Sequence, residues 1–144
     1  MLAVVARKGD RHHNAKRAKA RAAVQIVDDP DLYEAPAVHP LDVHEQPLQL
    51  PCGCRIIQRL QFERKSLVYF AIVWVARSPL GGWQEQYSCD TGHGYFHEHP
   101  SGHRTPRDRK DLRPLYTHVD VQECYDEAYD LVQDRHDKDC RRES

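Results

Sequence analysis

The sequence predicts an α+β domain in which a three- to four-stranded antiparallel sheet, connected as a meander, is covered by a C-terminal helix. Two observations predict this class. Residues 54–99 form short runs of alternating apolar and polar positions separated by turn residues, which is typical of half-buried strands. Residues 120–139 place apolar side chains at three- and four-residue steps, which is typical of a helix with one buried face. The connections are short, so a meander is the simplest topology.

Four strands are expected in order along the chain. Residues 54–63 alternate and predict a strand with one buried face, and residues 67–77 (LVYFAIVWVAR) are apolar on both faces, as expected of a central strand. A turn is expected at residues 78–82 (SPLGG) from its residue types. Residues 83–90 alternate again and predict the third strand, and residues 94–99 predict a short fourth one.

The helix is expected over residues 120–139, after a loop at residues 100–116 that holds three prolines and a glycine. Asp120 and Glu123 fit a capping box at its start. The apolar positions that recur at helical spacing are Val121, Cys124, Tyr125, Ala128, Leu131 and Val132.

The folded domain is expected to span residues 52–139, between a poorly ordered tail at residues 1–51 and a short C-terminal tail at residues 140–144. Residues 1–24 hold seven Lys or Arg against one Asp, whereas residues 25–50 hold six Asp or Glu and neither Lys nor Arg. The prolines of this acidic part exclude a continuous helix or a central strand. The basic part is either a nucleic-acid arm with an internal mimic of its ligand or a solvated tail, and the solvated tail is the simpler interpretation.

Membrane and secreted classes are not expected. No apolar run reaches the roughly 20 residues that a membrane-spanning helix needs, and the first residues do not form a secretory leader. The five cysteines are an odd number, so a disulfide framework is not expected either. These features predict a cytoplasmic protein without membrane partners.

The densest group of chemically active side chains lies in residues 89–103 (CDTGHGYFHEHPSGH), which hold four of the ten histidines. On the fourth strand, His97 and His99 share one face, and His93 lies in the turn after Asp90. An aspartate that accepts a hydrogen bond from one imidazole fixes its tautomer, and a neighbouring imidazole can then act as the acid. The pattern predicts a general acid–base site made of Asp90, His93, His97 and His99.

A basic loop follows this group and is expected to hold the phosphates of an RNA substrate. Its cationic side chains are Arg104, Arg107, Arg109 and Lys110. Cleavage of a phosphodiester would use His97 and His99 as base and acid. The preferred function is therefore a small RNA-directed enzyme that needs no cofactor.

Two alternatives remain for the same histidine-rich segment. In the first, it is a non-enzymatic zinc site whose ligands come from Cys89, His93, His97, His99 and His103, with Asp90 as a further candidate. In the second, it is an exposed polar hairpin without a ligand, and the chain is an interaction module that uses its charged tail.

Cys52 and Cys54 are separated by a single glycine. A disulfide between them would close a strained ring, and a zinc site would need partners such as Cys89 or Cys124. Reduced thiols at the start of a strand are the simpler interpretation. Cys124 lies on the apolar helix face, and Cys140 is expected to be an exposed thiol in the charged tail.

A strand that ends in a tyrosine and an aspartate, followed by histidines spaced H-x-x-x-H-x-H, resembles small bacterial and phage proteins, in particular the TumE-like toxin components of toxin–antitoxin pairs. The matching residues, within residues 54–103, are Tyr87, Asp90, His93, His97 and His99. Those proteins commonly show an Arg-Tyr-Asp-Asn run, where this chain reads Gln-Tyr-Ser-Cys-Asp. The resemblance implies a compact antiparallel sheet, a cytoplasmic protein, an antitoxin partner and RNA cleavage.

Overall fold

The computed structural model of the chain describes residues 31–103 and 105–140. All of the helices and strands in these described ranges belong to the unit Tyr33–Ser144. The basic segment at residues 1–24, with its two interpretations, and Arg104 lie outside the described residues.

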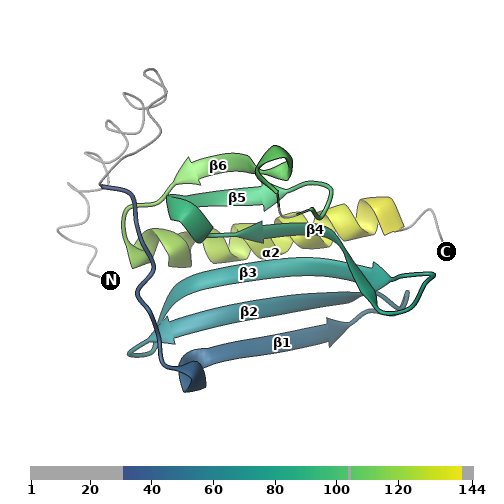
Figure 1. Cartoon of the computed structure of the whole chain (residues 1–144), viewed down its shortest axis with the longest axis horizontal. Helices are drawn as coiled ribbons and strands as arrows, with labels where there is room; N and C mark the ends of the chain where they lie inside the picture. Colours follow the sequence, from purple (N-terminus) through teal and green to yellow (C-terminus); the bar gives the residue numbers. More distant parts are fainter. Residues whose placement is uncertain (1–30, 104, 141–144) are drawn as a thin grey trace. The chain divides into compact units, whose positions relative to one another are not determined.

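The unit is an α+β fold in which six antiparallel strands follow one another in chain order and one long helix lies against the sheet (Figure 1). The strands are β1 (Val43–Gln49), β2 (Arg55–Glu63), β3 (Ser66–Arg77), β4 (Trp83–Asp90), β5 (Tyr95–His99) and β6 (Lys110–Pro114). The helix is α2 (His118–Cys140), and single turns of 3-10 helix form η1 (Pro40–Asp42), η2 (Gly92–Gly94) and η3 (Pro106–Asp108). The meander and the C-terminal helix predicted from the sequence are confirmed.

The expected count of three to four strands is wrong, because both edge strands escaped prediction. β1 pairs with β2 from Val43 opposite Gln61 to Gln49 opposite Arg55, in a stretch expected to belong to a poorly ordered tail. An edge strand pairs on one side only, so it tolerates the prolines that a central strand excludes. The side chains of β1 are all exposed, so its sequence carries no apolar alternation that would mark a strand.

The segment ahead of β1 also belongs to the unit. The backbone amide of Tyr33 donates to the carbonyl oxygen of Leu115 at 2.8 Å, and its hydroxyl donates to that of Val68 at 2.7 Å. These two bonds attach the chain to the start of β3 and to the residue after β6, ahead of the position 52 at which the sequence predicts the domain to begin.

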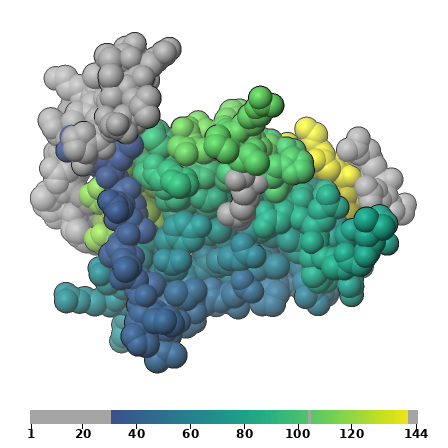
Figure 2. All heavy atoms as spheres, viewed as in Figure 1, coloured from purple at the N-terminus to yellow at the C-terminus, as the bar shows by residue number. Residues whose placement is uncertain are grey.

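The central strand β3 separates two faces of the sheet. Its residues from Phe70 to Val75 are all buried, as the doubly apolar run predicted. We call the side on which Phe70, Ile72 and Trp74 pack against α2 the covered face. The opposite side, which carries Ala71, Val73 and Val75, is the open face. The open face is turned towards the viewer in Figures 1 and 2, and α2 runs behind the sheet in Figure 1.

The helix begins two residues ahead of the expected start. The carboxylate of Asp120 accepts from the backbone amides of Tyr116 at 2.8 Å and Thr117 at 3.1 Å, so it closes the turn that leads into α2. The side chains of α2 that reach the covered face are Val121, Cys124, Ala128, Val132 and His136. Among the described residues, no helix is long and apolar enough to cross a membrane.

Candidate functional site

The pairing of β4 with β5 brings the predicted aspartate and two of the histidines together. Asp90 lies opposite His97, and Ser88 lies opposite His99. Because side chains alternate along a strand, Asp90, His97 and His99 all project from the open face, next to Ala71 of β3. The neighbours of these residues on each strand, such as Phe96, project into the covered face.

The three side chains are buried and in contact. Their exposed fractions are 4% for Asp90, 1% for His97 and 6% for His99. Oδ1 of Asp90 lies 2.9 Å from Nε2 of His97, and Oδ2 lies 3.4 Å from Nε2 of His99. The two rings meet edge to face, with centroids 4.9 Å apart. Both imidazoles thus direct their Nε2 atoms at the carboxylate of Asp90.

The position of Nδ1 of His97 limits where a proton can lie in the contact between Nε2 and Asp90. Nδ1 of His97 lies 3.0 Å from the carbonyl oxygen of Tyr95, which can only accept, so Nδ1 carries the proton. Nε2 then faces a carboxylate oxygen of Asp90. This contact is favourable when a proton lies between the two atoms, carried by the nitrogen or by the carboxyl group, or when a cation binds to both.

The turn between β4 and β5 holds the carboxylate in place. The backbone amide of Gly92 donates to Oδ1 of Asp90 at 2.8 Å. Thr91 anchors the turn to the centre of the sheet, since its amide donates to the carbonyl oxygen of Phe70 and its hydroxyl accepts from the amide of Phe70. His93 adopts a left-handed conformation with φ of 59° and is exposed, with its ring centroid 6.4 Å from that of His97.

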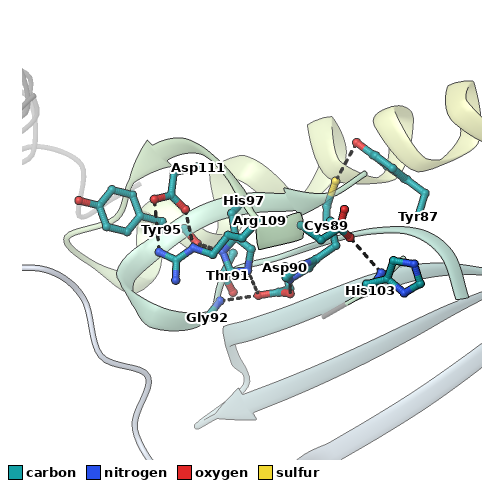
Figure 3. Close-up of polar contacts among 12 residues, drawn as sticks. Tyr87, Cys89, Asp90, Thr91, Gly92, Tyr95, His97, His103, Arg109 and Asp111 are labelled. Carbon is teal, nitrogen blue, oxygen red and sulfur yellow. Dashed lines mark hydrogen bonds and ion pairs between the residues drawn. The ribbon is translucent and has the colours of Figure 1, made fainter. Parts of the chain in front are cut away.

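These side chains line a cavity of about 530 Å³ on the open face. That volume is typical of sites for small molecules or for part of a larger substrate, which span about 300–1,000 Å³. Figure 3 shows Asp90 between Gly92 and His97, with Arg109 and Tyr95 beside them. The residues that line the cavity are Tyr69, Asp90, Gly92, His93, His97, His99, Thr105, Pro106 and Arg109.

Of the four predicted phosphate-binding residues, Arg109 lines the cavity. Its guanidinium binds the carboxylate of Asp111 at 2.7 and 3.3 Å and lies 5.7 Å from the centre of the Tyr95 ring (Figure 3). Arg107 is exposed and does not line the cavity, and Nζ of Lys110 lies 3.8 Å from Glu98. Of the three members of the set that the structure describes, Arg109 is therefore positioned to meet a ligand in the cavity.

The loop that carries Arg109 is closed by a carboxylate. Asp108 accepts from the backbone amides of Ser101 at 3.0 Å and His103 at 2.9 Å, and from the hydroxyl of Ser101. Desolvation acts to raise the pKa of Asp108, but these hydrogen bonds outweigh it and hold the pKa below its usual value. The carboxylate thereby fixes the wall of the cavity formed by Thr105 and Pro106.

Two residues of the predicted metal set lie elsewhere. Cys89 projects into the covered face, where its Sγ lies 3.5 Å from the hydroxyl of Tyr87 (Figure 3). Burial raises the pKa of Cys89 to about 12, so the thiol stays protonated at neutral pH. His103 is exposed and does not line the cavity.

Four residues of the cavity were missed. Tyr69 belongs to the run that predicts a strand apolar on both faces, Gly92 lies in the turn between β4 and β5, and Thr105 and Pro106 lie in the proline-rich loop. The alternation along β3 would have placed Tyr69 on the same face as Ala71. Nothing in the loop sequence indicates that Thr105 and Pro106 reach the cavity.

No protein-family model, curated protein or solved structure matches the chain. The resemblance to TumE-like toxins therefore stays a prediction.

Proposed function

We propose that the chain is a small metal-dependent hydrolase that cleaves phosphodiesters, with RNA as the substrate class, and that Asp90, His97 and His99 hold a divalent cation. One observation carries this proposal: a carboxylate oxygen and two imidazole nitrogens lie within 4.8 Å of one another, buried, at the wall of a cavity. Two histidines and one carboxylate are a common ligand set for catalytic metal ions with open coordination positions.

The hydrogen bonds behind the ligands fit this role. A histidine that binds a metal usually donates its second ring N–H to a backbone carbonyl or a carboxylate, which fixes the tautomer. His97 makes this bond to the carbonyl oxygen of Tyr95. A cation bound to Nε2 of His97 and to Asp90 also removes the unfavourable contact between a lone pair and a carboxylate oxygen.

The charges at the cavity also favour a bound cation. Arg109 is paired with Asp111, so the two largely cancel, and Asp90 contributes a buried negative charge that would repel a phosphate. A divalent ion reverses the sign of the charge at Asp90. Such an ion polarises a phosphoryl oxygen and lowers the pKa of water.

The remaining side chains of the cavity have separate roles. Arg109 can leave Asp111 and pair with a substrate phosphate through two parallel hydrogen bonds. His93 is exposed at the cavity, where it can donate a proton to the leaving oxygen. Both roles need side chains that solvent and substrate can reach.

Cationic and aromatic side chains elsewhere on the open face support RNA as the substrate class. The guanidinium carbons of Arg55 on β2 and Arg77 on β3 lie 4.4 and 4.7 Å from the centre of the Trp83 ring on β4. Val75 of the open face pairs with Arg55 and with Glu85. Arg77 and Trp83 each lie two residues along their strands from this pair, so the whole group lies on the face that holds the cavity. Guanidinium and aromatic side chains on one surface are typical of proteins that bind single-stranded nucleic acids.

The test is hydrolysis of a labelled single-stranded RNA by the purified full chain after chelation and after addition of Mn²⁺. Mn²⁺ prefers carboxylate ligands to thiolates, so it reports on this site. We expect hydrolysis with Mn²⁺ in the wild type and in His103→Asn, which alters a nearby exposed histidine, and none in His97→Asn. Equal hydrolysis by wild type and His97→Asn, or none in any sample, would overturn the proposal.

A second candidate uses the same residues without a metal. The separation of 2.9 Å between Nε2 of His97 and Asp90 is also that of a charge-assisted hydrogen bond, so a doubly protonated His97 fits the contacts. His99 and His93 would then act as acid and base on the RNA 2′-hydroxyl and phosphate. Cleavage that persists unchanged in chelator and is lost in His99→Asn would favour this mechanism.

The toxin-like role stays a prediction from the sequence. A toxin of this kind would stop the growth of a host cell when produced, and the growth arrest would require His97. Normal growth of cells that produce the folded wild-type chain would contradict that role, and it would leave the hydrolase proposal to be judged by the RNA assay.

A further inference from the structure

A second group of potential metal ligands lies on the covered face, away from the cavity. Cys52 and Cys54 belong to the turn that joins β1 to β2, and His136 and Cys140 lie in the last turns of α2. Figure 1 shows the C-terminal end of α2 at the same end of the sheet as this turn. Cys140 was expected to be an exposed thiol, but it is half-buried with its Sγ 3.8 Å from that of Cys54.

The four ligand atoms lie within 4.8 Å of one another. Sγ of Cys52 lies 3.1 Å from Nε2 of His136. In a tetrahedral zinc site with Zn–S bonds of about 2.3 Å, two sulfurs lie about 3.8 Å apart and a sulfur and a nitrogen about 3.5 Å apart. The separation of 3.8 Å between the sulfurs of Cys54 and Cys140 matches the first value. The separation of 3.1 Å between Cys52 and His136 is a few tenths of an ångström below the second.

The backbone presents each pair of ligands together. The amide of Leu50 donates to the carbonyl oxygen of Cys54 at 2.9 Å, and that of Gly53 donates to the carbonyl oxygen of Leu50 at 3.0 Å. Gly53 has a φ of 97°, which permits this tight turn. His136 and Cys140 are four residues apart on α2, so their side chains share one face of the helix.

The second nitrogen of His136 is held as a metal-binding histidine requires. Nδ1 of His136 lies 3.0 Å from Oδ1 of Asp137, and the ring packs edge to face on Trp74 with centroids 5.3 Å apart. A proton on Nδ1, donated to Asp137, leaves the lone pair of Nε2 directed at the sulfurs. Thiols that merely pack in a core need neither contact.

A disulfide explains the group less well than a metal. It would bring the sulfurs of Cys54 and Cys140 to about 2.05 Å, and it would leave Cys52 and His136 without a role. The partners that the sequence suggested for a zinc site, Cys89 and Cys124, are not members of this group. β4 pairs with the far side of β3, and the sulfur of Cys124 instead accepts from the guanidinium of Arg113 at 3.2 Å.

We propose that Cys52, Cys54, His136 and Cys140 bind one structural Zn²⁺ ion that joins the β1–β2 turn to the end of α2. Three thiolates and one imidazole complete a tetrahedral set and leave no open position, so the site is structural and not catalytic. The ion would connect the edge strand to the helix that covers the sheet. This zinc site does not depend on the hydrolase proposal.

The test is the zinc content of the full chain, produced with zinc in the medium and purified without chelators. We expect about one equivalent per chain in Asp90→Asn, which keeps only this site intact. The triple variant Asp90→Asn/Cys52→Ser/Cys140→Ser should lose that zinc. The matched control adds Cys124→Ser to Asp90→Asn, removes a buried cysteine outside the group, and should keep it. Zinc that stays in the triple variant, or a Cys54–Cys140 disulfide in folded, metal-free protein, would overturn the proposal.

A variant that fails to fold also loses zinc, so a second measurement uses the wild-type chain. Co²⁺ added to the reduced, metal-free protein should produce thiolate-to-metal absorption that saturates at about one equivalent, because three of the ligands are cysteines. The cavity site has no thiolate ligand and would not produce this absorption. Cobalt binding without a thiolate band would overturn the proposal, whereas RNA hydrolysis, present or absent, would not affect it.

Discussion

The substitution Asp90→Asn tests the candidate site most directly, because it changes the charge of the carboxylate and keeps its shape. The amide oxygen of Asn can still accept from the backbone amide of Gly92, now 2.8 Å from Oδ1. The amide nitrogen would replace Oδ2, which lies 3.4 Å from Nε2 of His99. The side chain is 4% exposed, so solvent compensates little for the lost charge.

The expected effect depends on metal. Without metal, we expect the free energy of unfolding to fall by about 1–3 kcal/mol, the range for a hydrogen bond to a charged group or for a buried polar atom left unsatisfied. With Mn²⁺ at a hundred times its dissociation constant, the wild type should gain about 2.7 kcal/mol. Asp90→Asn lacks the charged ligand of the set, so it should gain almost nothing.

The assay is urea unfolding followed by tryptophan fluorescence, with and without Mn²⁺. Glu45→Gln is the matched control, since this exposed carboxylate of β1 pairs with Arg59 outside the cavity. Its response to Mn²⁺ should equal that of the wild type. A Mn²⁺-dependent gain in Asp90→Asn as large as that of the wild type would refute the assignment of Asp90 as a ligand.

Three further substitutions probe the surroundings of the site. Gly92→Ala would place Cβ 3.1 Å from Oδ1 of Asp90. It should weaken Mn²⁺ binding in a titration with little change in stability, and unchanged affinity would argue against a fixed carboxylate. Gly102→Ala combines a φ of +79° with a Cβ only 2.3 Å from the carbonyl oxygen of Glu85. It should lower the free energy of unfolding by about 3 kcal/mol in urea, and a loss below about 1 kcal/mol would show that the loop moves aside. The pKa of Asp108 is lowered by folding, so its carboxylate stabilises the loop above about pH 4, and this contribution disappears as the pH falls through the lower folded value. The protection of the loop amides against hydrogen exchange, relative to an unstructured peptide at the same pH, should therefore fall at acid pH in the wild type, and Asp108→Ala should show low protection at every pH.

The sequence predicted the interior of the fold because burial there dictates the residue pattern. Residues of β3 are apolar on both faces because both faces are buried there, and those of β2 alternate because one face packs into the core. The edge strands lack this constraint. β1 is exposed throughout, and β6 holds a single apolar side chain, Leu112, so neither carries a periodic signal.

The candidate site was predicted in part for a similar reason. Alternation along β5 was enough to place His97 and His99 on one side, and their spacing from Asp90 suggested a short return. The register that sets Asp90 opposite His97 depends on the turn at Gly92 and on pairing with β3. The turn is local, but the pairing of Asp90 with Ala71 of β3 joins residues far apart in the chain.

The sequence alone determined which residues form the inner strands, which form the helix, and which segment holds the histidines, because each follows from local periodicity and residue type. Tertiary structure alone decided which side chains meet. It placed Arg109 at the cavity and turned Cys89 away from it. It also brought Cys52 and Cys54 of a hairpin turn against His136 and Cys140 of the helix, 84 and 86 residues later in the chain. Such contacts depend on packing between distant segments, and local residue patterns carry no record of that packing.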